Sequence, residues 1–176
     1  MHCYSDADLN GNPECSKYVS GWWVELVAPT SGRTCPLSWG VSGQTSTSSS
    51  TAESETVAFS HALRREALPL QELIEIAIGR PIVMKCKIDN TQAIVAVSKG
   101  YSKQLRHLPR TQRICLELLH ELTSTADNRI ELEHCGTASM KADIFTKSMA
   151  APKFLESSRL IGDGPLRRCG GCSCIC

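Results

Sequence analysis

The sequence predicts an α/β domain in which helices pack on a mixed β-sheet. Three runs rich in strand-forming residues come first and are joined by short turns, which is typical of an antiparallel meander. Helical and strand-like runs then alternate, so the expected order is β-β-β-α-β-α-β-α. A chain of 176 residues is long enough to bury a core without disulfides or a structural metal.

The meander is expected to begin close to the N-terminus. Its strands are predicted at residues 2–8, 19–28 and 35–41. The polar turn Asn10 to Pro13 ends the first strand, and Leu37, Trp39 and Val41 alternate with small residues in the third. We interpret Trp22, Trp23 and Trp39 as packing residues of the core and sheet rather than as stacking platforms for bases.

Helix signals dominate the second part of the chain, after a Ser- and Thr-rich connection at residues 44–50. Ser50 to Glu53 matches a capping box, and Pro69 is the expected end of that first helix. The later elements are predicted as helices at 70–78 and 91–98, strands at 83–88 and around 130–132, a longer helix opened by Pro109, and a last helix capped by Thr137.

Composition restricts the classes of protein and partner. The net charge of +1 excludes a general polycation, and no apolar run is long enough to span a bilayer. The first residues lack a secretory signal, so the ten cysteines are expected to be thiols, with Cys3, Cys86 and Cys115 buried. We expect one domain over residues 1–162 and a disordered Gly- and Cys-rich tail over residues 163–176.

Four carboxylates, Asp6, Glu55, Asp89 and Asp143, lie at ends of apolar runs or on an inward helix face, where an isolated charge is costly. Individually, Asp6 fits a turn, Asp89 a helix cap and Asp143 the first turn of a helix. Glu55 has no such explanation, because it shares a face with Ala58 and Phe59, whereas the capping box accounts for Glu53. Together the four residues predict a shared site for two Mg²⁺ ions, with Mn²⁺ as a substitute.

Basic residues gather between positions 85 and 113, with one acidic residue, Asp89, among them. They are Lys85, Lys87, Lys99, Lys103, Arg106, His107, Arg110 and Arg113. Cations beside an acidic metal site could hold the phosphates of a nucleic acid, although each residue is as well explained by a solvated surface.

Six segments match the motifs of one family in order and spacing. They are Tyr4–Gly11, Ser20–Val24, Leu37–Trp39, Ser49–Ala58, Ile88–Ile94 and Lys141–Lys147. Over about residues 3–162 the chain resembles the ribonuclease H domain of copia-type LTR retrotransposon Pol polyproteins. Departures are Leu9, where the family has Trp, and Thr56, where it has an aromatic residue.

The resemblance implies a ribonuclease H-like fold, a five-stranded mixed sheet whose first three strands are antiparallel. It implies that Asp6, Glu55, Asp89 and Asp143 are the metal-binding catalytic set of an endonuclease that cuts the RNA strand of RNA–DNA hybrids. It also implies an upstream reverse transcriptase domain and a location in cytoplasmic retrotransposon particles or the nucleus. Substrate contacts are expected from Asn90, Arg106, Arg110, Arg113 and His134, although for His134 a strand-end residue without a role is the preferred interpretation.

Two rival interpretations remain open from the sequence. Because the chain begins almost at Asp6, it could be a truncated or inactive remnant that binds nucleic acid without cutting it. An integrase shares the fold type, but its late acid is Glu. Here that position is Asp143, and Glu55 falls between Asp6 and Asp89, which disfavours strand transfer.

Overall fold

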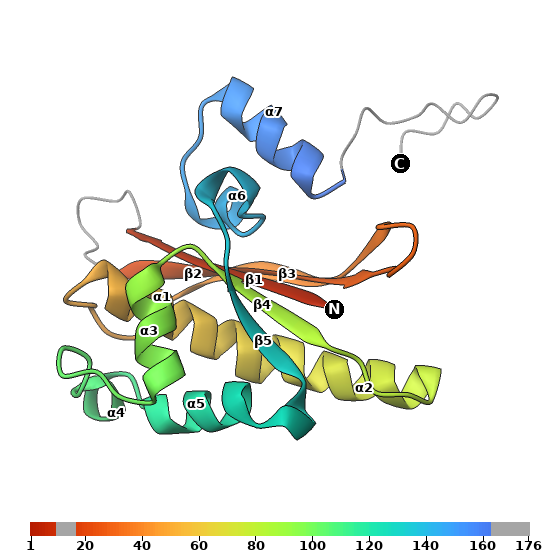
Figure 1. Ribbon diagram of the computed structural model, residues 1–176. Coiled ribbons are helices and arrows are strands. Elements are labelled where there is room, and N and C mark those ends of the chain that lie inside the picture. The colour runs from red at the N-terminus through yellow and green to blue at the C-terminus, as the bar shows by residue number, and fades with distance from the viewer. Residues whose placement is uncertain (10–16, 163–176) are drawn as a thin grey trace.

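The computed structural model describes residues 1–9 and 17–162, and it contains one five-stranded sheet with the order β3-β2-β1-β4-β5 (Figure 1). The strands are β1 (His2–Leu9), β2 (Tyr18–Val27), β3 (Thr34–Gly43), β4 (Met84–Ile88) and β5 (Ile130–His134). β1, β2 and β3 pair antiparallel, whereas β1 pairs parallel with β4 and β4 with β5. The predicted mixed sheet with an antiparallel first half is confirmed.

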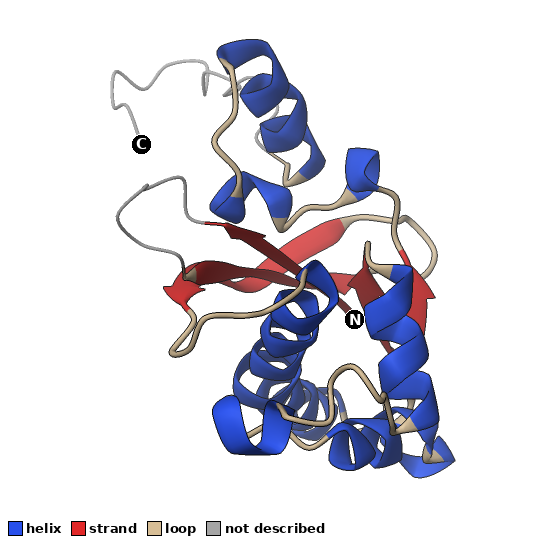
Figure 2. Ribbon diagram, turned by 90° about the vertical axis from the view of Figure 1, so that its left-hand side faces the viewer, coloured by secondary structure: helices blue, strands red, loops and turns tan. Residues whose placement is uncertain are grey.

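Helices cover both faces of this sheet. They are α1 (Thr51–His61), the π-helical segment η1 (Ala62–Ala67), α2 (Leu68–Ile78), α3 (Thr91–Lys99), α4 (Leu108–Thr111), α5 (Leu116–Ser124), α6 (Asp143–Thr146) and α7 (Ala151–Leu160). Short 3-10 turns occur at Ala126–Asn128 and Thr137–Ser139. Helices α1 to α5 lie on one side, and α6 and α7 on the other (Figures 1 and 2).

The main core lies between the sheet and helices α1, α3 and α5. Fully buried side chains such as Phe59, Leu63 and Ile88 fill it. A smaller cluster under α6 contains Tyr4 and Trp23. β1 is therefore covered on both faces, and Asp6 in the middle of this strand is fully buried. Cys3 and Cys86 are buried as expected, but Trp39 is 56% exposed and packs on Trp23 at the sheet surface.

The predicted end of the first helix at Pro69 is wrong. α1, η1 and α2 follow one another without a break, and Pro69 is the second residue of α2. The N–H of Leu68 donates to the carbonyl of Leu63, five residues earlier, which is π-helical bonding. The π-helical turns before Pro69 shift the hydrogen bonds by one residue relative to an α-helix. The ring of Pro69 and its missing N–H therefore do not end the helix.

The single helix expected from Pro109 is also wrong. α4 ends at Thr111, Arg113 takes a left-handed conformation with φ 56°, and α5 begins only at Leu116. As a result Ile114 is buried outside a helix, and Cys115, expected to be buried, is exposed.

The C-terminal prediction needs a similar correction, because Thr137 starts a 3-10 turn and the helix carrying Asp143 has Ala142 at its N-cap. Helix α7 was not expected. The predicted turn at Asn10 to Pro13 and the predicted tail at 163–176 lie outside the described residues. None of the helices in the described part of the chain has the length and apolar character needed to cross a membrane.

Candidate metal centre and nucleic-acid surface

The ends of two parallel neighbouring strands bring two of the predicted carboxylates together. Tyr4 of β1 pairs with Lys87 of β4, so Asp6 and Asp89, each two residues further on, come to the same edge of the sheet. Glu55 reaches this edge from the first half of α1. One carboxylate oxygen from each of Asp6, Glu55 and Asp89 lies within 4.8 Å of the others.

Glu55 is the most unusual acid of the group. Its Oε1 accepts a hydrogen bond from the Ala7 N–H at 3.3 Å, while its Oε2 is buried and has no partner among the described residues. Burial, followed by the charges of Asp6 and Asp89, raises the pKa of Glu55 to about 9. An unpaired buried carboxylate oxygen is costly, and a cation would supply the missing partner.

Asp143 joins the group through a lysine. The Lys147 Nζ lies 2.8 Å from Asp143 Oδ1 and 3.2 Å from Asp6 Oδ1, and 4.0 Å from Asp89 Oδ2. Thr146 Oγ1 also donates a hydrogen bond to Asp6. The three-residue group of Asp6, Glu55 and Asp89 does not include Asp143, which is linked to it through Lys147. We use the name carboxylate cleft for these four acids together with Lys147.

The close approach of α6 to β2 makes these contacts possible. Gly21 pairs with Asp6 across the β1–β2 ladder. A Cβ at Gly21 would lie 2.5 Å from Thr146 Cγ2 and 3.2 Å from the Ala142 carbonyl oxygen. Glycine at this position therefore lets α6 dock where Thr146 and Lys147 can reach the carboxylates.

The acids of this cleft outnumber their cation. Burial raises the pKa of Asp143 to about 6 despite the hydrogen bond from Lys147, and burial with the Asp6 charge raises the pKa of Asp89. Burial alone would lower the pKa of Lys147, but the hydrogen bond to Asp143 and the Asp6 charge raise it above the ordinary value. The donor set is entirely oxygen, which fits Mg²⁺ or Mn²⁺.

Glu53 lies two residues from Glu55 and has a different environment. Ser50 Oγ accepts from the Glu53 N–H at 3.2 Å, which confirms the predicted cap of α1. The Glu53 carboxylate accepts from the Ser49 N–H and Oγ at 2.7 and 2.6 Å, so the reciprocal bond reaches Ser49 rather than Ser50. His107 Nε2 lies 3.1 Å from the other oxygen. Glu53 is therefore a fully bonded structural residue.

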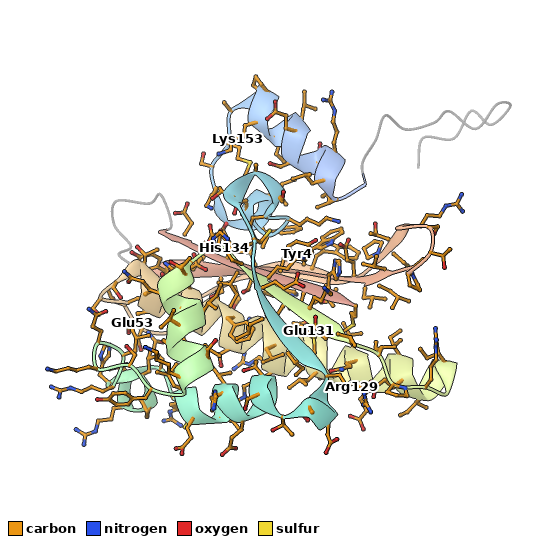
Figure 3. The ribbon with its side chains drawn as sticks, viewed as in Figure 1. Tyr4, Glu53, Arg129, Glu131, His134 and Lys153 are labelled. Carbon is orange, nitrogen blue, oxygen red and sulfur yellow. The ribbon has the colours of Figure 1, made fainter. Side chains whose placement is uncertain are left out.

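Two of the remaining predicted site residues, Asn90 and His134, lie next to Asp89. Asn90 caps α3, where its Oδ1 accepts from the N–H groups of Gln92 and Ala93 at 2.9 and 3.0 Å. His134, at the end of β5 (Figure 3), places Nε2 3.1 Å from the Asp89 carbonyl oxygen. Asn90, and not its neighbour Asp89, is therefore the N-cap of α3.

The basic residues of positions 85–113 differ in whether an acidic side chain already pairs with them. Lys85 and Lys87 form ion pairs with Glu133 on β5 at 2.6 and 2.8 Å, so they are not free for phosphates. Arg106, Arg110 and Arg113, in or beside α4, are exposed. Lys99 and Lys103 are exposed as well, so these lysines and the three arginines have the surface exposure that phosphate binding requires.

Lys147 is the main residue of the cleft to which sequence reasoning gave no role. Its only local signal is the spacing of four residues from Asp143, which is an ordinary helical ion pair. Its contacts with Asp6 and Asp89 depend on the docking of α6 and could not be read from the sequence.

No family model matches the chain, and no curated protein sequence matches it. Among solved structures, it is similar to RNase H1 from the halophilic archaeon Halobacterium salinarum NRC-1, with a TM-score of 0.50, 17% identity, and coverage of 88% of this chain and 96% of the other. It is also similar to LC11-RNase H1 in complex with an RNA/DNA hybrid, with a TM-score of 0.52, 16% identity, and coverage of 82% and 92%. With the sheet order, these similarities show the predicted ribonuclease H-like fold.

Proposed function

We propose that this chain is a metal-dependent ribonuclease H that hydrolyses the RNA strand of RNA–DNA hybrids during retrotransposon reverse transcription. The observation that carries the proposal is the convergence of Asp6, Glu55 and Asp89 within 4.8 Å, from three separate elements. Separate rigid elements can hold like charges together that would otherwise move apart. The fold and the sequence motifs support the same activity, and one structure with this fold contains an RNA/DNA hybrid.

In this proposal each acid has a defined role at the cleft. Asp6 and Asp89 would be shared by two Mg²⁺ or Mn²⁺ ions, Glu55 would complete the site of one ion, and Asp143 would complete the site of the other. When bound, the ions supply Lewis acidity that activates a water and stabilises the leaving oxygen of the phosphodiester. Lys147 is a positioning residue, because its ammonium group holds Asp6 and Asp143 together and reduces their repulsion. No side chain is required as a nucleophile.

The proposed substrate is recognised by its backbone and its shape. A hybrid presents 2′-hydroxyl groups across a wide minor groove, which distinguishes it from duplex DNA. The exposed Arg106, Arg110 and Arg113 are proposed to contact its phosphates. The proposed context is a Pol polyprotein with an upstream reverse transcriptase domain, in cytoplasmic particles or the nucleus.

Incubation of the purified chain with a labelled hybrid tests this proposal. We expect RNA-strand cleavage with Mg²⁺ or Mn²⁺, none with chelator, and none of single-stranded RNA or duplex DNA. Asp89→Asn is the matched inactive control, since it removes a charge at almost constant shape. Cleavage that persists in chelator, or at equal rate in the Asp89→Asn protein, would show that a contaminating nuclease or another site is responsible.

A further inference from the structure

Helix α6, which carries Asp143 into the carboxylate cleft, has only four residues and no side-chain cap at its N-terminus. One helical turn is not stable alone, because a single backbone hydrogen bond does not offset the conformational entropy lost in forming it. The packing of the rest of the chain must therefore fix α6. The position of Asp143 depends on the contacts of α6 and of the residues beside it.

The contacts made by the residues after Asp143 involve the cleft itself. Thr146 Oγ1 donates a hydrogen bond to Asp6. Lys147 Nζ lies 3.2 Å from Asp6 Oδ1 and 2.8 Å from Asp143 Oδ1. A metal ion bound by these carboxylates would compete for the same oxygen atoms. These contacts therefore cannot fix α6 equally with and without metal.

A second anchor lies on Lys141, two residues before Asp143. Lys141 Nζ donates to both carboxylate oxygens of Glu25, at 2.9 and 2.7 Å. The Glu25 side chain is buried, and the Lys141 side chain is only 12% exposed. Lys141 Nζ also lies 5.6 Å from the ring centroid of Tyr4 and 6.0 Å from that of Trp23. Charge-assisted hydrogen bonds and two aromatic rings therefore hold this ammonium group in one place.

The anchor on Lys141 is separate from the carboxylate cleft. Gly21 pairs with Asp6 across the β1–β2 ladder, and Glu25 lies four residues further along β2. Four residues of a strand span about 13 Å, so a metal ion in the cleft would not contact Glu25. Ala142, the residue that follows Lys141, is fully buried in the cluster under α6. The anchor is therefore connected to α6 through packed chain and should stay formed whether or not metal is bound.

We propose that Glu25 and Lys141 are positioning residues that hold Asp143 where it completes the site of the second metal ion. This inference rests on the proposed function for the presence of that ion. Neither side chain touches metal or substrate, and both act through Asp143 alone. Glu55 and Asp89 lie on other elements, so loss of the Glu25–Lys141 pair should weaken binding of the second ion and spare the first.

Titration with Mn²⁺, followed by electron paramagnetic resonance of the free ion, measures the two binding steps without substrate. The test variant combines Glu25→Gln with Lys141→Met, which removes the pair without leaving a buried charge. We expect the first step to be kept and the second to weaken by about 10- to 100-fold, as for loss of a residue that orients a metal ligand. Lys141→Arg keeps the charged pair and should keep both steps. The matched control Lys85→Met makes the same substitution in an exposed ion pair with Glu133, and it should also keep both steps.

A double-mutant cycle with Asp143→Asn separates positioning from a general structural effect. If the pair acts through Asp143, adding Glu25→Gln and Lys141→Met to the Asp143→Asn protein should not weaken the second step further. A single binding step in the wild type, equal weakening of both steps in the test variant, no weakening of either, or additive effects in the cycle would overturn the proposal. A failed cleavage assay together with the predicted loss of the second ion would support the positioning role and would refute only the proposed hydrolysis.

Discussion

The paired strands β1 and β2 carry two buried acidic sites that differ in how their charge is balanced. Glu25, opposite His2, accepts hydrogen bonds from Lys141 Nζ at 2.9 and 2.7 Å and from Trp23 Nε1 at 2.9 Å. Burial alone would raise its pKa, but hydrogen bonds from His2, Lys141 and Trp23 lower the pKa of Glu25 to about 2. Side chains of the protein itself therefore supply Glu25 with both a cation and hydrogen-bond donors.

The cleft around Asp6, at the other end of the same ladder, has too few cations and hydrogen-bond donors for its acids. Its four carboxylates share one ammonium group, that of Lys147, and one oxygen of Glu55 has no partner among the described residues. The pKa of Glu55 is raised to about 9 rather than lowered. Burial of an acid therefore does not by itself indicate function, whereas a deficit of positive charge and hydrogen-bond donors around it does.

The largest effect is expected from an acid of the cleft. Asp89→Asn should reduce hybrid cleavage at least ~100-fold, as for loss of a group that stabilises transition-state charge, while the fold is kept. Single-turnover cleavage and circular dichroism measure the two properties. A wild-type rate in this variant would remove Asp89 from the catalytic set.

The two glutamates of α1 test the same contrast within one helix. Glu55→Gln should abolish cleavage, whereas Glu53→Gln should cost about 1 kcal/mol of stability, as for a lost cap, and leave the rate per folded molecule unchanged. Denaturant melts with parallel cleavage assays separate these outcomes. If Glu53 proved to be the essential residue, the assignment of this helix face would be wrong by two positions.

The two lysines provide a matched pair of substitutions. Lys141→Met leaves Glu25 buried without its cation and should cost about 3–5 kcal/mol, which no metal restores. Lys147→Met should also destabilise the metal-free protein, but Mg²⁺ or Mn²⁺ should restore much of that loss by neutralising the same carboxylates. Equal recovery of both variants with metal would contradict the distinction between the two sites.

The contributions of Glu55 and Glu25 to folding stability should depend on pH with opposite signs. The pKa of Glu55 is raised from 4.5 to about 9 in the folded protein. Its contribution to folding stability is therefore fully present below pH 4.5 and is lost as the pH rises through 9. The lowered pKa of Glu25 gives stability that is present above pH 4.5 and is lost as the pH falls through about 2. In chelator, stability should fall between pH 5 and 9, and Glu55→Gln should flatten this decline. If stability declined equally in the Glu55→Gln variant, groups other than Glu55 would be responsible for the decline.

The strands of the sheet and the buried position of Glu55 could be predicted because their signals are local. Alternating side chains mark the strands, and Glu55 shares its helix face with Ala58 and Phe59, which fixes the buried side of α1. Lys147 could not be assigned, since its contacts depend on Gly21 admitting α6 against β2. The continuous helix through Pro69 depends on π-helical bonding that no local sequence rule indicates.

The recess lined by Arg64, Arg65 and Arg113 could not be predicted from the sequence either. Arg64 and Arg65 belong to a helix and Arg113 to a break between two others, and nothing in their spacing relates them. The break itself, a left-handed arginine, contradicts the helix signal that Pro109 gives. Tertiary packing brings these residues together against local preference, so a sequence pattern could not identify the recess.

Thermal melting with and without Mg²⁺ or Mn²⁺ tests the central claim most directly, because a cation that binds only the folded cleft must stabilise it. The predicted gain for the wild type is about 2.7 kcal/mol at a hundredfold excess of metal over its dissociation constant. Asp6→Asn, Asp89→Asn and Asp143→Asn should each raise the stability of the metal-free protein and shrink the gain from metal. The surface control Glu156→Gln should do neither. An equal metal-induced shift in the wild type and in the three aspartate variants would contradict a shared metal site at this cleft.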